Sequence, residues 1–402
     1  MKRVGPGLMV MAAFIGPGTV ITASKAGAQF GFALMWALLF SIVATLVLQE
    51  MAARLGLVTG KGLSEALRSS FDSRLFNFLA IASVILAIGL GNAAYESGNI
   101  TGASMGLAAI TPWSANVWAL VVGGTAFALL AAGRYQVVER GLIVLVVVMS
   151  SVFLLTMLMV KPDPAAILSG LTQPSLPAGA TLTVIALIGT TVVPYNLFLH
   201  ASSVREKWPD TVPVGVALAE SRRDSLFAIS LGGLITLAIV STSAVAFAGG
   251  ETAFSAATIS QQLEPLLGSA AKYFFAIGLL AAGLTSAITS PLAAAYAVSG
   301  ALGWKPDLAD RRFKAIWALV LGCGMVAAAL GARPINAIIF AQAANGFLLP
   351  IVAVYLLYVM NSKALLGDYK NNGWSNLLGG LVVIVVSGLS IFKISQVFGY
   401  AG

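Results

Sequence analysis

The feature that most constrains this chain is a succession of eleven long apolar stretches that fill nearly all of it. Each has about the 20 mostly apolar residues that an α-helix needs to cross a bilayer. Charged residues make up only 9% of the chain, against roughly a quarter in soluble domains. We therefore predict an all-α polytopic membrane protein with eleven transmembrane helices and no separate soluble domain. The expected spans are 7–28, 31–53, 76–104, 114–133, 140–160, 180–204, 217–248, 266–299, 312–332, 335–360 and 373–398.

The positive charges indicate an orientation. With the N-terminus in the cytoplasm, eighteen of the 23 lysines and arginines lie on the cytoplasmic side, as the positive-inside rule requires. The five exceptions are Lys25, Lys161, Lys272, Arg333 and Lys393. We predict a multi-pass cell-membrane protein with its C-terminus outside. Because the charges form no single basic patch, we expect lipid and a transported ion or small solute as partners, and no nucleic acid.

Two of the apolar stretches are interrupted. The first contains Gly16-Pro17-Gly18 and the sixth contains Val193-Pro194; proline lacks the backbone N–H and glycine weakens a helix. A broken helix is tolerated in lipid only where its freed backbone is buried or lines a cavity. Two such breaks in corresponding halves indicate the central site of a secondary transporter. Five helices precede the second break, so we predict inverted repeats over about 7–160 and 180–360, with an eleventh helix at 373–398.

Ionisable residues inside a membrane are functional candidates by default. Glu96, in the third span, is the clearest, with a transport or proton role or a structural pair with Lys25 as alternatives. His200 is the only histidine, and it either couples protons or is a hydrogen-bonded core residue. Asp224 and Glu50, near the inner ends of their helices, either join an inner gate or mark orientation.

Several segments carry a family resemblance. GPGLMVMAAFIGPGT at the first break, PYNLFLHAS at the second and AQAANGFLLP in the tenth span resemble the Nramp family of metal-ion transporters, within the LeuT-type superfamily. The similarity covers almost the whole chain. It implies a LeuT-type 5+5 inverted repeat with helices 1 and 6 broken. It also implies transport of divalent metal ions by alternating access, driven as symport by protons or another ion gradient.

The family's metal ligands are mostly replaced in this chain. Its first break usually reads Asp-Pro-Gly-Asn, where this sequence has Gly16 and Thr19 at the outer positions. Its second break usually reads Met-Pro-His-Asn, where this sequence has Val193, Tyr195 and Asn196. Of the replaced ligands, only Thr19 keeps a side-chain oxygen. We expect Tyr195 to line the pathway or to fill it, and the Asn196 side chain to satisfy freed backbone groups.

The resemblance places further groups at the site. These are the backbone carbonyls of Ala13 and Thr190 and the side chain of Gln342, while His200 matches a family histidine on the proton or conformational path. The expected site therefore offers neutral oxygen without sulfur or carboxylate, which suits a largely hydrated ion such as Mg²⁺.

Three classes of function remain open from the sequence. Transport of divalent ions of the Mg²⁺ or Mn²⁺ type leads, and the alternative is the same fold carrying an amino acid or another small organic solute. A membrane receptor or sensor would be expected to carry a signalling domain. We expect no enzyme and no cofactor, because the chain has no Gly-x-x-x-x-Gly-Lys-Ser/Thr motif and its only histidine has no evident nucleophile and carboxylate partners.

Overall fold

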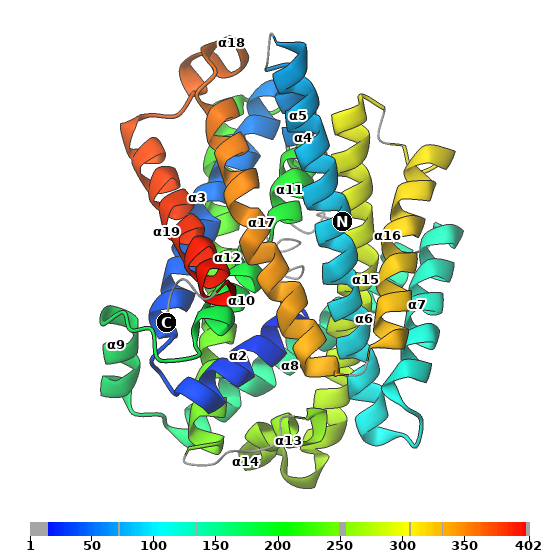
Figure 1. Cartoon of the computed structure of the whole chain (residues 1–402), viewed down its shortest axis with the longest axis vertical. Helices are drawn as coiled ribbons and strands as arrows, with labels where there is room; N and C mark the ends of the chain where they lie inside the picture. Colours follow the sequence, from blue (N-terminus) through cyan, green and yellow to red (C-terminus); the bar gives the residue numbers. More distant parts are fainter. Residues whose placement is uncertain are drawn as a thin grey trace.

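The computed structural model describes residues 15–70, 73–133, 135–248, 255–304, 307–331 and 333–398. Helices joined by short turns make up nearly all of these residues (Figure 1). The long helices are α2 (Pro17–Phe30), α3 (Met35–Thr59), α5 (Arg74–Val84), α6 (Gly91–Ile110), α7 (Ala115–Ala132), α8 (Tyr135–Val160), α10 (Thr181–Thr191), α11 (Pro194–Lys207), α12 (Val214–Ala246), α15 (Ala271–Leu302), α16 (Arg311–Leu330), α17 (Pro334–Met360) and α19 (Gly373–Val397).

Ten of the eleven predicted membrane spans have a counterpart among the described residues. Within the described ranges, ten helical segments are long and apolar enough to cross a bilayer. The first span is represented by the 14-residue α2, and its earlier part lies outside the described residues. The helix α3 is longer than the predicted second span, because it continues to Thr59 instead of ending at residue 53. It continues because Arg54 is not a solvated end residue: its guanidinium is hydrogen-bonded inside the protein.

The third span is unusually long, as predicted. The segments α5, η1 (Ile85–Leu90) and α6 form one 37-residue helical path from Arg74 to Ile110. The central segment η1 is a π-helix, and such wide turns are rare and often lie at functional sites. This turn sets the rotation of α6 immediately before Asn92 and Glu96.

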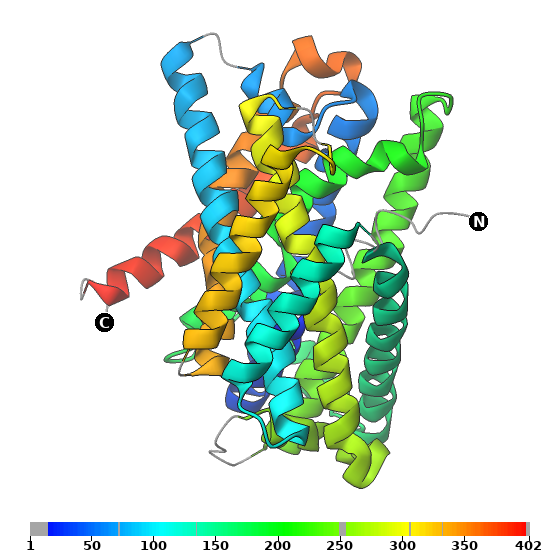
Figure 2. The same cartoon turned by 90° about the vertical axis from the view of Figure 1, so that its right-hand side faces the viewer.

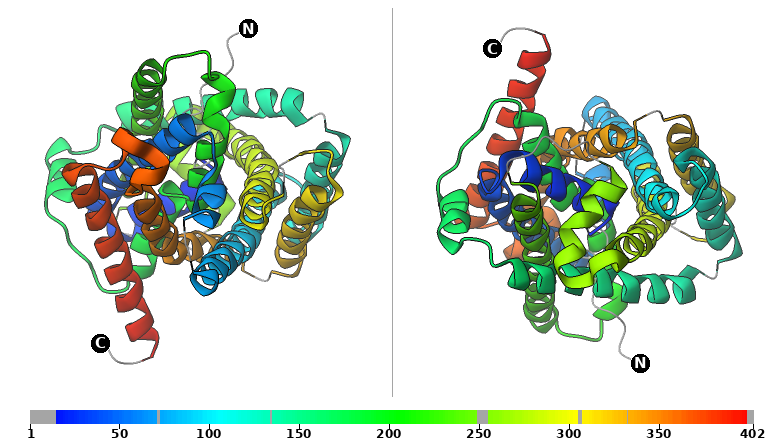
Figure 3. Two further views of the ribbon diagram at one scale, coloured as in Figure 1. Left: turned by 90° about the horizontal axis from the view of Figure 1, so that it is seen from above. Right: turned by 90° about the horizontal axis from the view of Figure 1, so that it is seen from below.

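The broken sixth span is the centre of the molecule. In the most apolar part of this span, 94% of the residues are buried inside the protein, whereas only 22% are buried in the corresponding part of α19. Figure 3 shows the other helices arranged around it, and Figures 2 and 3 show α19 leaning away from the bundle toward the C-terminus. Exposed leucine and isoleucine side chains on the outer helices, such as Leu319 and Ile384, suit contact with lipid tails.

The short helices lie at opposite ends of the bundle. At one end are α4 (Leu63–Arg68) and α18 (Lys363–Leu366); at the other are α9 (Pro164–Thr172), α13 (Ala256–Ser260) and α14 (Glu264–Leu267) (Figure 1). Connections that follow even-numbered spans thus lie at one end and connections that follow odd-numbered spans at the other, as expected when successive helices cross the bilayer in opposite directions. Which end faces the cytoplasm remains a prediction.

Two glycines allow the closest helix contacts at the centre. A Cβ on Gly102 of α6 would lie 2.1 Å from the Cβ of Pro17, and a Cβ on Gly189 of α10 would lie 2.1 Å from the carbonyl oxygen of Gln342. Small residues allow membrane helices to approach backbone to backbone. These contacts bring α6 against the first break and α17 against the helix that ends at the second.

Candidate functional site

The second predicted break is present between α10 and α11, and at the first the structure describes the helix that begins at proline, while the residues before Ile15 lie outside the described ranges. Gly16 is extended and Pro17 opens α2. At the second break α10 ends with Thr191, and Pro194 opens α11. Proline fits the first helical position because its missing N–H has no partner to lose there. Each half-helix therefore begins at the centre of the protein with its positive dipole end.

A direct hydrogen bond joins the two broken helices. The hydroxyl oxygens of Thr19, in the first turn of α2, and Thr190, near the end of α10, lie 2.8 Å apart. Both residues are fully buried. Two residues that the sequence analysis assigned to the predicted site are therefore in contact through their hydroxyl oxygens.

Gln342 of α17 covers the first break. A Cβ on Gly18 would lie 2.0 Å from its Nε2 atom, so the amide packs directly on the Gly18 backbone. Gln342 is fully buried, and neither its Oε1 nor its Nε2 has a hydrogen-bond partner among the described residues. An amide that is buried without partners is free to bind a ligand that enters between the breaks.

Glu96 lies on α6, packs against Gly324 of α16, and is fully buried. Its Oε2 accepts a hydrogen bond from Asn99 Nδ2 at 3.2 Å, while its Oε1 has no partner in the described part of the chain. The hypothetical pair with Lys25 is not formed between these two described residues, so that interpretation was wrong for this conformation. Lys25 is half-buried on α2, and the nearer amide of Asn99, one helical turn from Glu96, takes the carboxylate instead.

The second break is lined by aromatic and apolar groups. Tyr195 is fully buried and packs edge-on against Tyr95 with ring centroids 5.4 Å apart; Val193 is also buried. Neither side-chain atom of Asn196 has a partner within the described ranges. The expectation that this side chain satisfies freed backbone groups is therefore wrong. The Asn196 backbone N–H instead bonds the carbonyl of Val193 at 3.1 Å, which closes the turn without the side chain.

His200 links α11 to α3. Its Nδ1 lies 2.7 Å from Oε1 of Gln49, so with this amide orientation the ring donates to the glutamine. Its Nε2 is buried and has no partner within the described residues. The lone histidine is therefore at least a hydrogen-bonded core residue, and its proton role remains a prediction.

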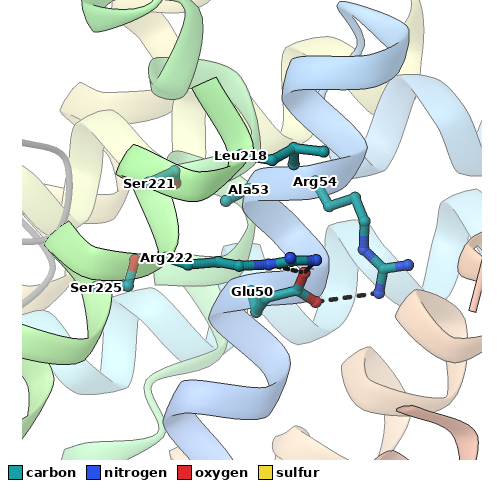
Figure 4. Close-up of a pocket in the computed structure, with 7 residues that line it drawn as sticks. All are labelled: Glu50, Ala53, Arg54, Leu218, Ser221, Arg222 and Ser225. Carbon is teal, nitrogen blue, oxygen red and sulfur yellow. Dashed lines mark hydrogen bonds and ion pairs between the residues drawn. The ribbon is translucent and has the colours of Figure 1, made fainter. Parts of the chain in front are cut away.

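A charged cluster lies where the C-terminal half of α3 meets the N-terminal half of α12. Glu50 accepts from Arg54 at 3.0 Å and from Arg222 at 2.8 Å, and Figure 4 shows the two arginines reaching it from opposite sides. The cluster lines a small pocket with Ala53, Leu218, Ser221 and Ser225. Arg54 also donates to Asn371 Oδ1 and the Tyr369 carbonyl, each at 2.8 Å. The Glu50 carboxylate therefore connects α3 to α12 directly, and Arg54 connects it to the segment of Tyr369 and Asn371.

Asp224 of α12 forms a separate ion pair. Its Oδ1 is 3.2 Å from Nζ of Lys207, the last residue of α11. The pair therefore connects α12 to the C-terminal end of α11. Its predicted place in an inner gate remains a prediction.

We expect Glu50→Gln to destabilise the protein more than Arg222→Gln does. The Arg54 side chain is only 7% exposed, so loss of Glu50 leaves a buried cation without its carboxylate, whereas Arg222 is 58% exposed. The first change should remove about 1–3 kcal/mol, because Arg54 keeps its bonds to Asn371 and Tyr369, and the second at most about 1 kcal/mol. Melting temperatures of the two variants in one detergent would test this, and equal values would contradict it.

Sequence reasoning missed several residues of the site. Asn99 follows Glu96 by one helical turn, and Arg54 follows Glu50 at i+4, so helical spacing alone could have paired them. Gln49 had no such signal because its partner, His200, comes from another helix. No group of three or more His, Cys, Asp or Glu side chains able to hold a metal occurs in the described ranges. Ala13 lies outside the described residues.

This arrangement defines a class of protein: multi-pass membrane transporters with two broken helices at their centre. The structure superposes on Mhp1, a nucleobase-cation-symport-1 family transporter, with a TM-score of 0.60 at 13% identity, covering 98% of this chain and 94% of that one. It superposes better on the manganese transporter of Eremococcus coleocola, with a TM-score of 0.76 at 23% identity, covering 98% and 86%. The LeuT-type fold class is thereby confirmed.

Within that class, the model of the family described as natural resistance-associated macrophage protein-like matches residues 7–396. The chain belongs to the Nramp family. It is 28% identical to the divalent metal cation transporter MntH of Acidiphilium cryptum over 403 residues, 98% of this chain and 90% of that protein. It is 29% identical to the metal transporter Nramp5 of Oryza sativa subsp. japonica over 427 residues, which cover 99% of this chain and 76% of that protein.

Proposed function

We propose that this protein is a secondary transporter that moves divalent metal ions across the cell membrane by alternating access around its two helix breaks. Family membership and metal-transporting relatives in bacteria and a plant support the substrate class. The observation that carries the proposal is the buried contact between Thr19 and Thr190, one from each broken helix. A ligand bound there touches both moving elements, which is what alternating access needs.

The chemistry of the site favours a hard ion. Oxygen ligands suit Mg²⁺ and Mn²⁺, while a sulfur ligand would favour later transition metals; here Val193 supplies none. Mg²⁺ keeps several of its waters when bound, so a few neutral oxygens suffice to hold it. The ion enters when the Thr19–Thr190 hydrogen bond opens, and the two hydroxyls and the Gln342 amide oxygen then face the ion or its waters.

An organic solute is the less favoured substrate. The relatives that this chain matches along nearly its whole length are named as transporters of metal ions. The Thr19–Thr190 contact and the Gln342 amide supply oxygen atoms that can face an ion or its waters. We place the N-terminus in the cytoplasm on the distribution of positive charge, and an ion gradient drives the transport.

The expected result is uptake of Mg²⁺, with less Mn²⁺, into proteoliposomes under an inward proton gradient. Thr19→Val keeps the branched shape but removes the hydroxyl, and it should lower uptake at least tenfold, equivalent to about 1.4 kcal/mol. Thr236→Val is the matched control, because that buried threonine only bonds the Gly232 carbonyl in its own helix. Uptake of neither ion by folded protein would refute metal transport.

A further inference from the structure

Two arginines from different helices lie against the residues that directly follow α15. The guanidinium of Arg68, at the end of α4, packs on the backbone of Gly303, where an added Cβ would overlap it. The guanidinium carbon of Arg312, in the first turn of α16, lies 5.2 Å from the centre of the Trp304 ring. Because Gly303 and Trp304 are consecutive, the two positive charges lie on one small surface.

The fold holds both guanidiniums in place. Gly303 ends α15 with φ +73°, a left-handed conformation that suits glycine, and its missing side chain leaves room for Arg68. On the α16 side, the Phe313 ring packs edge-on against Tyr296 of α15, with ring centroids 5.1 Å apart. This contact fixes the rotation of α16 next to Arg312. A guanidinium stacked on a tryptophan ring is held further by cation–π attraction.

Neither guanidinium has a carboxylate partner among the described residues, whose ion pairs all lie elsewhere. The described carboxylates of this connection are used by the backbone instead. Asp310 accepts from the Arg312 backbone N–H at 2.7 Å, and Asp307 accepts from the Ala309 backbone N–H at 2.8 Å. Both arginines are exposed. Their planar N–H donors are therefore available for the oxygens of a phosphate, which arginine binds in a bidentate manner.

The surroundings of the two arginines match a membrane interface. The segment that spans the membrane ends at Leu302, immediately before the two contacted residues. Leu302 is 37% exposed and Leu308 is 45% exposed. Trp304 is partly exposed, and tryptophan is enriched at the level of the lipid headgroups. A molecule with a phosphate for the arginines and an acyl chain for the leucines fits this surface.

We propose that the surface formed by Arg68, Arg312 and Trp304 binds the phosphate of an anionic phospholipid. The bound lipid touches one arginine from α4 and one from α16, so it connects these two helices across the end of α15. Each arginine near an anionic lipid strengthens binding about fivefold. The surface uses none of the residues of the Thr19–Thr190 junction, and the proposal does not depend on the transported substrate.

The primary test is binding of radiolabelled phosphatidylglycerol to the purified full chain immobilised in detergent. We expect saturable binding that unlabelled phosphatidylglycerol displaces. Phosphatidylcholine with the same acyl chains should compete at least tenfold less well, because its choline group cancels the negative charge and repels the guanidiniums. Inorganic phosphate is added in a separate competition, which distinguishes a lipid from a free anion.

Variants assign the binding to the two arginines. Arg68→Gln combined with Arg312→Gln should weaken binding at least tenfold. Arg312→Gln alone should weaken it about fivefold, and it tests the proposal even if the double variant folds poorly, because this exposed side chain forms no hydrogen bond within the described ranges. Arg311→Gln is the matched control: it removes the same charge from the neighbouring exposed residue and should change the affinity less than twofold.

Each outcome decides the proposal. Selective binding of phosphatidylglycerol that depends on Arg312 and not on Arg311 supports the lipid site. Equal competition by phosphatidylcholine would show that the headgroup charge is not recognised. Displacement by millimolar inorganic phosphate would assign the surface to a free anion and overturn the lipid. If Arg311→Gln weakens binding as much as Arg312→Gln does, the lipid responds only to the overall positive charge and the site does not exist.

Discussion

Replacing Gly189 with alanine should prevent the protein from folding stably, with a loss of more than about 4 kcal/mol. The added Cβ would lie 2.1 Å from the carbonyl oxygen of Gln342 and 2.5 Å from the backbone nitrogen of Gly346. Backbone atoms cannot rotate away as a side chain can, so α10 and α17 would have to separate. That movement would also withdraw Gln342 from the first break.

The measurement is the yield and melting temperature of monodisperse protein in detergent. Gly124→Ala is the matched control, because Gly124 also lies inside a membrane helix and a Cβ there meets nothing within 4 Å. Alanine is favoured over glycine in a helix by roughly 0.8–1 kcal/mol, so this control should be neutral or slightly stabilising. A Gly189→Ala protein that melts like the native chain would show that the two helices can separate without loss.

The fold was largely predictable from the sequence because the bilayer leaves few choices. Backbone groups in lipid must be satisfied internally, so long apolar stretches become helices and Pro17 and Pro194 interrupt them. The division of the chain into repeats over 7–160 and 180–360 remains a prediction.

The side-chain contacts were less predictable, because they depend on how the helices are rotated against each other. Lys25 and Glu96 have similar predicted depths, but depth does not determine which residue faces which. The π-helical turn η1 sets the direction of Glu96, and no motif marks it in the sequence. Thr19 and Thr190 could be placed together only because each belongs to a break and the breaks meet.

The metal site of the family should be recoverable in this chain with four substitutions. Gly16→Asp, Thr19→Asn and Val193→Met supply the carboxylate, amide and thioether that its sequence lacks. The structure adds one requirement, because a Cβ at Gly16 would lie only 3.0 Å from Ser286 Oγ. Ser286→Ala removes that oxygen and makes room for the carboxylate. We expect this variant to bind Mn²⁺ at least tenfold more tightly than the native chain does, about 1.4 kcal/mol.

The role of sulfur is tested by changing one position of that variant. Leucine in place of methionine at position 193 has a similar volume and no thioether, so both versions share any overpacking around the buried Val193. Since sulfur favours the later transition metals over Mg²⁺, only the methionine version should prefer Mn²⁺ to Mg²⁺. Calorimetric titration of both proteins with both ions measures this directly. If the folded methionine version gains no affinity for Mn²⁺, the positions of the helix breaks, and not only their side chains, differ from those of a metal site.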